Sequence, residues 1–178
     1  MIQTASVQPR VFNSSRPAFL DACAAVMLVL EERGLEHARV NLLKCFNPAG
    51  SFFITSFCFF EALGVLKRKM LKRQIVYDHY VKCCYMLLNY RETSRFRLHE
   101  PKISTFQPFR SAKTLGEKYS VDLSDALQIV DLAHGEFSHY VQDSKPLLIT
   151  VDGDLEKAAR TEGLRVWNCK DAKTPPEQ

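Results

Sequence analysis

Short apolar runs alternate with longer amphipathic segments along the chain. Four runs predict strands within residues 17–21, 51–56, 146–152 and 164–168. Helical composition and the spacing of apolar positions predict helices at residues 22–34, 36–47, 57–73, 77–90, 111–120, 123–135 and 154–163. A segment containing Pro and Phe at residues 95–109 predicts a further strand with loops. This alternation indicates a three-layer α/β/α fold with a central parallel sheet of four or five strands.

The chain of 178 residues is long enough for one domain with a substantial core. Residues 1–16 have no clear periodicity, so we expect an irregular lead-in before a single domain at residues 17–169. Residues 67–110 are expected to form an extended basic helical region inside this domain. Residues 170–178 read as a polar tail.

The apolar runs are too short for a membrane protein. A membrane-spanning helix needs about 20 apolar residues, and the longest candidate here is interrupted by Glu61. Residues 22–30 resemble the core of a signal peptide in length, but acids flank them on both sides. We therefore expect a cytoplasmic protein without a membrane partner.

Cysteine and glycine patterns exclude other common classes. The six cysteines lie mostly within apolar patterns without zinc-ligand spacing, which favours reduced core residues over disulfides. No glycine-rich phosphate loop or dinucleotide-binding fingerprint is present. The sequence therefore gives no support for a nucleotide cofactor.

Charge is distributed unevenly along the chain. Residues 67–118 contain 13 Lys and Arg against 4 Asp and Glu, whereas the other residues contain 11 against 16. Five basic residues are concentrated at the end of one predicted helix: Lys67, Arg68, Lys69, Lys72 and Arg73. Such a stretch can hold a polyanion, although a basic run is more often a solvated helix face.

Acids follow or flank the predicted strands. Asp21 and Asp152 each end an apolar run, and Asp154 is the expected N-cap of the helix after Asp152, which leaves Asp152 without a capping role. Glu61 lies in the second turn of the helix after the second strand, and Asp125 opens a helix before the strand that ends at Asp152. Because the carboxyl ends of parallel strands share one sheet edge, these four acids are expected to meet there.

A carboxylate cluster of this kind implies a cation. Mutual repulsion makes such a cluster costly unless divalent cations or raised pKa values neutralise it. Oxygen ligands without Cys or His favour Mg²⁺ or Mn²⁺ over zinc, and such ions promote phosphodiester hydrolysis. Taken singly, each acid is equally compatible with a helix-terminal or surface role.

Four segments around these acids resemble, in order, the signatures of PIN-domain nucleases, including the VapC-type toxins of bacterial toxin–antitoxin pairs. The segments are "FLDAC", "ITSFCFFEALGVLKRK", "YSVDLSDALQIVDLA" and "LLITVDGDLEKAARTEGLRVW". Each motif alone is weak, whereas the order of all four is specific. The resemblance runs from about residue 17 to residue 168.

The resemblance implies a PIN-like fold and an Mg²⁺- or Mn²⁺-dependent endoribonuclease. Four carboxylates would hold the metal and position the attacking water: Asp21, Glu61, Asp125 and Asp152. Asp122 is a candidate fifth ligand or, equally, a helix N-cap. Ser56 and Thr150 match small polar positions beside the family's acids, and either also fits a cap or a strand-edge hydroxyl. The basic stretch of Lys67–Arg73 would help to hold the RNA backbone.

Two features depart from this family pattern. Ala22 and Cys23 follow Asp21 where family members commonly carry Thr or Ser and then Asn, which removes a supporting hydrogen bond. The segment of residues 67–110 is also longer than the compact, toxin-like members of the family need. The alternative is a catalytically weak or inactive PIN-fold binding or scaffold protein.

Protein partners are the least constrained feature. The toxin class implies an antitoxin partner. Residues 75–90 contain more apolar side chains than one helix face needs, which predicts a homodimer interface that includes Ile75, Val76, Tyr77, Tyr80, Met86 and Leu87. A helical hairpin packed on its own domain is an equally good reading.

Overall fold

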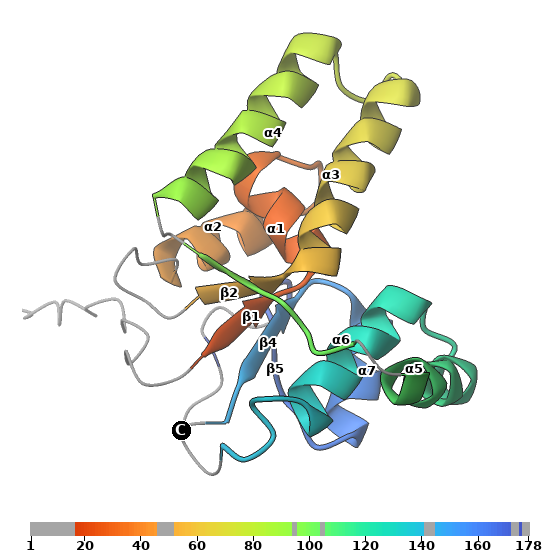
Figure 1. Ribbon diagram of the computed structural model, residues 1–178. Coiled ribbons are helices and arrows are strands. Elements are labelled where there is room, and N and C mark those ends of the chain that lie inside the picture. The colour runs from red at the N-terminus through yellow and green to blue at the C-terminus, as the bar shows by residue number, and fades with distance from the viewer. Residues whose placement is uncertain are drawn as a thin grey trace, which may run out of the picture.

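The computed structural model describes residues 17–45, 52–93, 96–103, 106–140 and 145–171, together with residue 175 (Figure 1). The expected lead-in at residues 1–16 and most of the expected tail lie outside the described residues. The described elements are β1 (Ala18–Leu20), α1 (Ala22–Val29), α2 (Glu36–Cys45), β2 (Phe52–Thr55), α3 (Ser56–Leu71), α4 (Tyr77–Glu92), β3 (Arg97–His99), α5 (Phe106–Tyr119), α6 (Leu123–His134), β4 (Leu147–Thr150), α7 (Gly153–Thr161) and β5 (Arg165–Asn168).

These strands form one parallel sheet in the order β3-β2-β1-β4-β5. β1 lies at the centre, where Phe19 is opposite Phe53 of β2 and Leu148 of β4. The chain runs from β1 outward to β2 and β3 and then returns to the other side of β1 as β4. The strand order therefore changes direction between β1 and β4, and open parallel sheets bind ligands beside the carboxyl ends of such a pair.

Helices cover both faces of the sheet, so the predicted three-layer α/β/α fold is confirmed (Figure 1). Leu20, Ile54 and Ile149 point into one core, which they share with α1 to α4. Phe19 and Leu148 point the opposite way into a second core with α5, α6 and α7. This alternation follows from the period of two along a strand, and it explains why the strand sequences are apolar at nearly every position.

The helices α3 and α4 form a hairpin that projects away from the sheet (Figure 1). The buried positions of α3 end at Leu66, and α4 buries only Cys83 and Leu87 within the described residues. Arg73 reverses the chain at the far end with a left-handed φ of 57°. The predicted extended helical region is therefore observed up to Glu92, and its far end has little core of its own.

Several predicted helix boundaries are wrong, two of them by more than one helical turn. The helix predicted at residues 22–34 ends at Val29, because Leu30 leaves the helix in an extended conformation and is buried, and Gly34 then turns the chain with a φ of 85°. The helix predicted at residues 111–120 begins at Phe106. Pro108 is tolerated in its first turn, where backbone N–H groups have no helical partner.

The six cysteines are all free, and four of them are buried. No helix of the described ranges combines the length and the apolar character that a membrane crossing requires.

Candidate functional site

The carboxyl edge of the two central strands holds Asp21 and Asp152. Asp21 follows β1 and is the N-cap of α1, where its Oδ1 accepts a hydrogen bond of 2.5 Å from the backbone N–H of Ala24. Asp152 is the N-cap of α7, and its Oδ1 accepts from the N–H groups of Asp154 and Leu155 at 2.8 and 3.1 Å. The expectation that Asp154 caps this helix is therefore wrong, because Asp154 lies in the first turn.

Thr150 joins these two acids. Its buried hydroxyl donates a short hydrogen bond to Asp21 Oδ2 and accepts one of 2.9 Å from the backbone N–H of Asp152. The N–H of Asp21 also donates to the carbonyl of Ile149 at 3.1 Å. Asp21 is only 2 % exposed, so its carboxylate lies inside the protein at the end of the sheet.

A second group of acids comes from α3 and the start of α6. Ser124 Oγ lies 2.7 Å from Glu61 Oε2 and 2.8 Å from Asp122 Oδ1. Asp122 is the N-cap of α6, where its Oδ1 accepts from the N–H of Asp125 at 2.9 Å. Since one hydroxyl has one proton, Ser124 can donate to only one of these carboxylates at a time. Ser124 therefore lies between Glu61 of α3 and the N-cap of α6, and it can hold either carboxylate.

Electrostatic interactions link the two groups. Burial raises the pKa of Asp21 to about 7; hydrogen bonds from Thr150 and Ala24 oppose this effect, and the charges of Asp152 and Glu61 add to it. An aspartate otherwise has a pKa of 3.8. Asp21 is thus a buried acid that neutral pH only partly ionises.

Asp125 is perturbed in the same direction. Its pKa is raised to about 8, first by burial and then by the charges of four neighbouring carboxylates, Asp122, Asp21, Glu61 and Asp152. The thiol of Cys23 is exposed, yet its pKa is raised to about 12, first by reduced solvation among its neighbours and then by the charges of Asp21, Asp152, Asp125 and Glu61. All four predicted acids therefore act on one small region, which we call the acidic edge, and Cys23 lies within it.

The side chains of the acidic edge do not form a complete metal-coordination site in this structure. Among the described residues, no three Asp, Glu, His or Cys side chains are placed together as a set that could hold a metal ion. Charges act over several ångströms, whereas ligand oxygens must lie about 2.0–2.6 Å from Mg²⁺ or Ca²⁺. Both oxygens of Asp21 already accept hydrogen bonds. Each keeps a second lone pair, so the all-oxygen donor set fits a hard divalent cation once the side chains converge.

The basic stretch lies along α3 and beyond its end rather than around the acids. Lys67 is 6 residues after Glu61, which corresponds to about 9 Å along a helix, and Lys72 and Arg73 lie beyond the end of α3. Lys69 forms an ion pair of 3.0 Å with Glu32. Lys67, Lys72 and Arg73 are exposed to solvent, as is Arg68. The basic stretch can therefore contact a ligand only where that ligand extends along the projecting hairpin.

Ser56 does not cap α3, contrary to that reading of its sequence. The N-cap is Thr55, whose buried Oγ1 accepts from the N–H of Cys58 at 3.3 Å, and Ser56 is the first residue of the helix. A hydroxyl side chain occupies both positions, so the sequence alone could not distinguish them.

Sequence reasoning missed the roles of Ser124 and Gln128. Gln128 is fully buried on α6, and its Nε2 donates to the carbonyl of Leu20, the residue before Asp21, at 3.3 Å. Its Oε1 has no hydrogen-bond partner among the described residues. The sequence signal for these roles was that polar residues lie on the same face of α6 as its apolar core positions. His99 and Asp131 form a further buried pair, with 3.0 Å between Nε2 and Oδ2.

Comparison with known proteins supports the fold and gives no information on function. No family model matches the chain, and no curated protein matches it. The crystal structure of PAE2754 from Pyrobaculum aerophilum is similar, with a TM-score of 0.53 and 15% sequence identity, over 87% of this chain and 88% of that one. At this identity the similarity concerns the fold alone.

Proposed function

We propose that this protein is a PIN-like endoribonuclease that hydrolyses RNA phosphodiester bonds with Mg²⁺ or Mn²⁺. The observation that supports this best is the acidic edge, where acids from four separate chain segments act on one another at the switch point of a parallel sheet. A fold gains nothing in stability by placing repelling carboxylates around the buried Asp21, so their arrangement favours a ligand that neutralises them. The order of the four motifs supports the same conclusion.

Each residue of the acidic edge has a definite task in this proposal. Asp21, Glu61, Asp125 and Asp152 would hold the cation, which supplies an activated water and stabilises charge on the phosphate. Thr150 orients Asp21 by donating to it, and Ser124 orients Glu61 or Asp122. Their hydroxyls thus fix the carboxylates from which the site is assembled.

The assay is cleavage of a mixed RNA pool in Mn²⁺, compared with the same reaction in EDTA. Asp21→Asn and Asp152→Asn are well-defined variants, because Asn is as good an N-cap as Asp and preserves the helix starts while it removes the charge. Both should abolish cleavage. Asp154→Asn, two residues beyond Asp152 and exposed, is the matched control and should cleave normally. Metal-independent cleavage, or equal cleavage by the variants, would reject the proposal.

A binding or scaffold protein is the second candidate. It is favoured by large apolar side chains at the far end of the hairpin, where Leu71, Val76 and Tyr77 are 66 %, 72 % and 66 % exposed. This hairpin tip, defined by these three residues, would contact a second copy of the chain or an antitoxin. Leu87, named in the predicted dimer interface, is instead buried in the chain's own core.

A further inference from the structure

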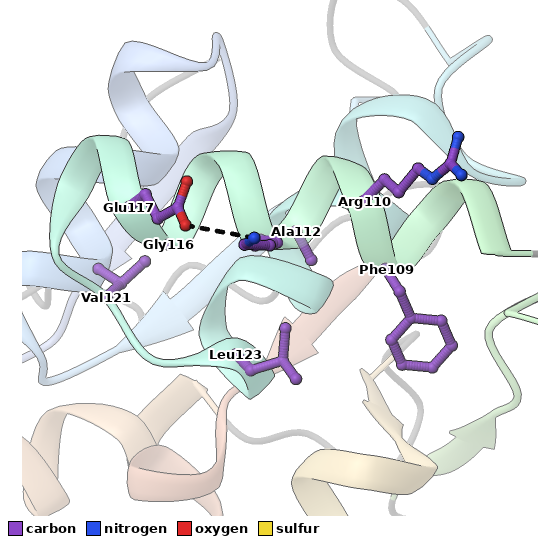
Figure 2. Close-up of a pocket in the computed structure, with 8 residues that line it drawn as sticks. Phe109, Arg110, Ala112, Gly116, Glu117, Val121 and Leu123 are labelled. Carbon is purple, nitrogen blue, oxygen red and sulfur yellow. Dashed lines mark ion pairs between the residues drawn. The ribbon is translucent and has the colours of Figure 1, made fainter.

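A hollow of about 430 Å³ lies on α5 beside the start of α6 (Figure 2). We call it the α5 pocket. One helix face supplies Phe109, Ala112, Lys113 and Gly116, at the spacing that places side chains on one side of a helix. Val121 and Leu123 complete it from the following loop and helix. Figure 2 shows Leu123, at the start of α6, on the side of α5 to which Phe109 points.

The α5 pocket exposes large apolar side chains. Phe109 is 37 % exposed and Leu123 is 51 % exposed, although Ala112 between them is fully buried. Gly116 lets the loop after α5 pack closely against the helix, because a Cβ there would lie 3.2 Å from the carbonyl oxygen of Val121. Adjacent exposed apolar groups in a hollow of this volume are typical of a site for a small flat ligand or for part of a larger one.

The pocket and the acidic edge are continuous along the chain. Leu123 lies between Asp122, the N-cap of α6, and Ser124, whose hydroxyl contacts Glu61. Asp125 follows directly. A ligand that contacts Leu123 therefore contacts the residue that lies between Asp122 and Ser124 in the sequence.

The charged groups of the pocket match a nucleotide. Arg110 and Lys113 belong to its lining and can attract phosphate, and Lys113 forms an exposed ion pair of 3.7 Å with Glu117. The Glu117 carboxylate can accept a hydrogen bond from a base, such as the ring N–H of uracil. The exposed ring of Phe109 provides the stacking surface that proteins use to bind unpaired bases.

We propose that the α5 pocket binds one base of a single-stranded RNA, stacked on Phe109, while the adjoining phosphate lies at the acidic edge. This inference rests on the proposed function, since it assigns the pocket to the substrate of that site. The pocket would set where the strand is held relative to the carboxylates.

The test is fluorescence anisotropy in EDTA with two labelled oligomers of equal length. One is a single-stranded oligouridine, and the other has the same sugar–phosphate backbone without bases. Phe109→Leu keeps apolar bulk and removes the ring, so it should weaken oligouridine binding about 5- to 100-fold and leave the baseless oligomer unchanged. Phe109→Trp should restore oligouridine binding. Tyr85→Leu, at a 68 % exposed aromatic position on α4, is the matched control and should change neither oligomer.

Three results would overturn the base-binding proposal. They are equal binding of oligouridine by wild type and Phe109→Leu, no oligouridine binding by the wild type, and a wild-type dimer that Phe109→Leu dissociates in light scattering. The last would assign the pocket to a second copy of the chain.

Cleavage in Mn²⁺ separates the two proposals. If Asp21→Asn abolishes cleavage while Phe109→Leu binds normally, the nuclease stands and the base site fails. If Phe109→Leu weakens oligouridine binding but the wild type does not cleave RNA, the base site stands and the nuclease proposal fails.

Discussion

Removing the charge of Asp21 should stabilise this protein at alkaline pH. The pKa of Asp21 is raised from 3.8 to about 7, chiefly by burial. Between these values the folded state keeps a proton that the unfolded state has lost, so this group's contribution to stability falls as the pH rises. The unfolded aspartate is already ionised at pH 5, and the folded one ionises near pH 7. The loss of stability between pH 5 and pH 8 is therefore about 3 kcal/mol, at 1.36 kcal/mol per unit.

Asp21→Asn removes this titration, and it also removes one of the charges that raise the pKa of Asp125, which changes the pH dependence in the same direction. The amide oxygen can still accept from the N–H of Ala24, and the amide nitrogen can donate to the Thr150 hydroxyl oxygen. Any cost of rearranging these bonds is the same at pH 5 and at pH 8. The difference between the two pH values therefore isolates the charge.

The assay is urea unfolding of wild type and Asp21→Asn at pH 5 and pH 8 in EDTA. The free energy of unfolding of the variant, relative to wild type, should rise by about 3 kcal/mol between the two conditions. Asp154→Asn should show no such rise. Parallel loss of stability in wild type and Asp21→Asn would refute the assignment of a buried, protonated Asp21.

Three further predictions concern other parts of the structure. Thr150→Val should unfold more easily than Thr150→Ser by about 2 kcal/mol at pH 8, as measured in urea, because only Ser keeps the hydroxyl that contacts Asp21; equal stabilities would contradict this. If the basic stretch contacts RNA phosphates, reversing Lys67 and Lys72 to Glu should make the log–log salt dependence of RNA binding shallower by about 1.4, and an unchanged slope would leave these residues as a solvated helix face. If the hairpin tip forms a dimer, Val76→Glu with Tyr77→Glu should give a monomer of about 20 kDa in light scattering, whereas a wild-type monomer would end the dimer proposal.

The sequence was sufficient to predict the layers of the fold. β1 and β4 are buried on both faces, so they read as continuous apolar runs that end where the next helix is capped. Because the strands are parallel, acids at the ends of these runs had to lie at one edge. Boundaries were less predictable, since Thr55 and Ser56 offer equivalent caps and only the backbone conformation selects between them.

The internal arrangement of the acidic edge could not be predicted in this way. The bond from Thr150 to Asp21 depends on the register of β4 against β1, and that from Ser124 to Glu61 depends on how closely α6 approaches α3. Neither distance has a local sequence signal. The basic stretch also follows Glu61 closely in sequence, yet the rise of α3 and the projection of the hairpin carry its last residues well away from the acids.

The α5 pocket was not anticipated at all. Phe109 was assigned to a segment of strand and loops, and only its place on α5 brings it to the face that meets Leu123. A side chain directly after Pro108 is easily misread, because Pro signals a loop unless it lies in the first turn of a helix.

Isothermal titration with Mn²⁺ at pH 8 tests the central claim most directly, since that claim is that the acidic edge holds a divalent cation. Wild type and Asp154→Asn should bind Mn²⁺ with the same stoichiometry, and Asp21→Asn and Asp125→Asn should lose that binding, because each removes a charge from the acidic edge. No binding by the wild type at millimolar Mn²⁺, or equal binding by all four proteins, would contradict the account and favour a binding or scaffold protein.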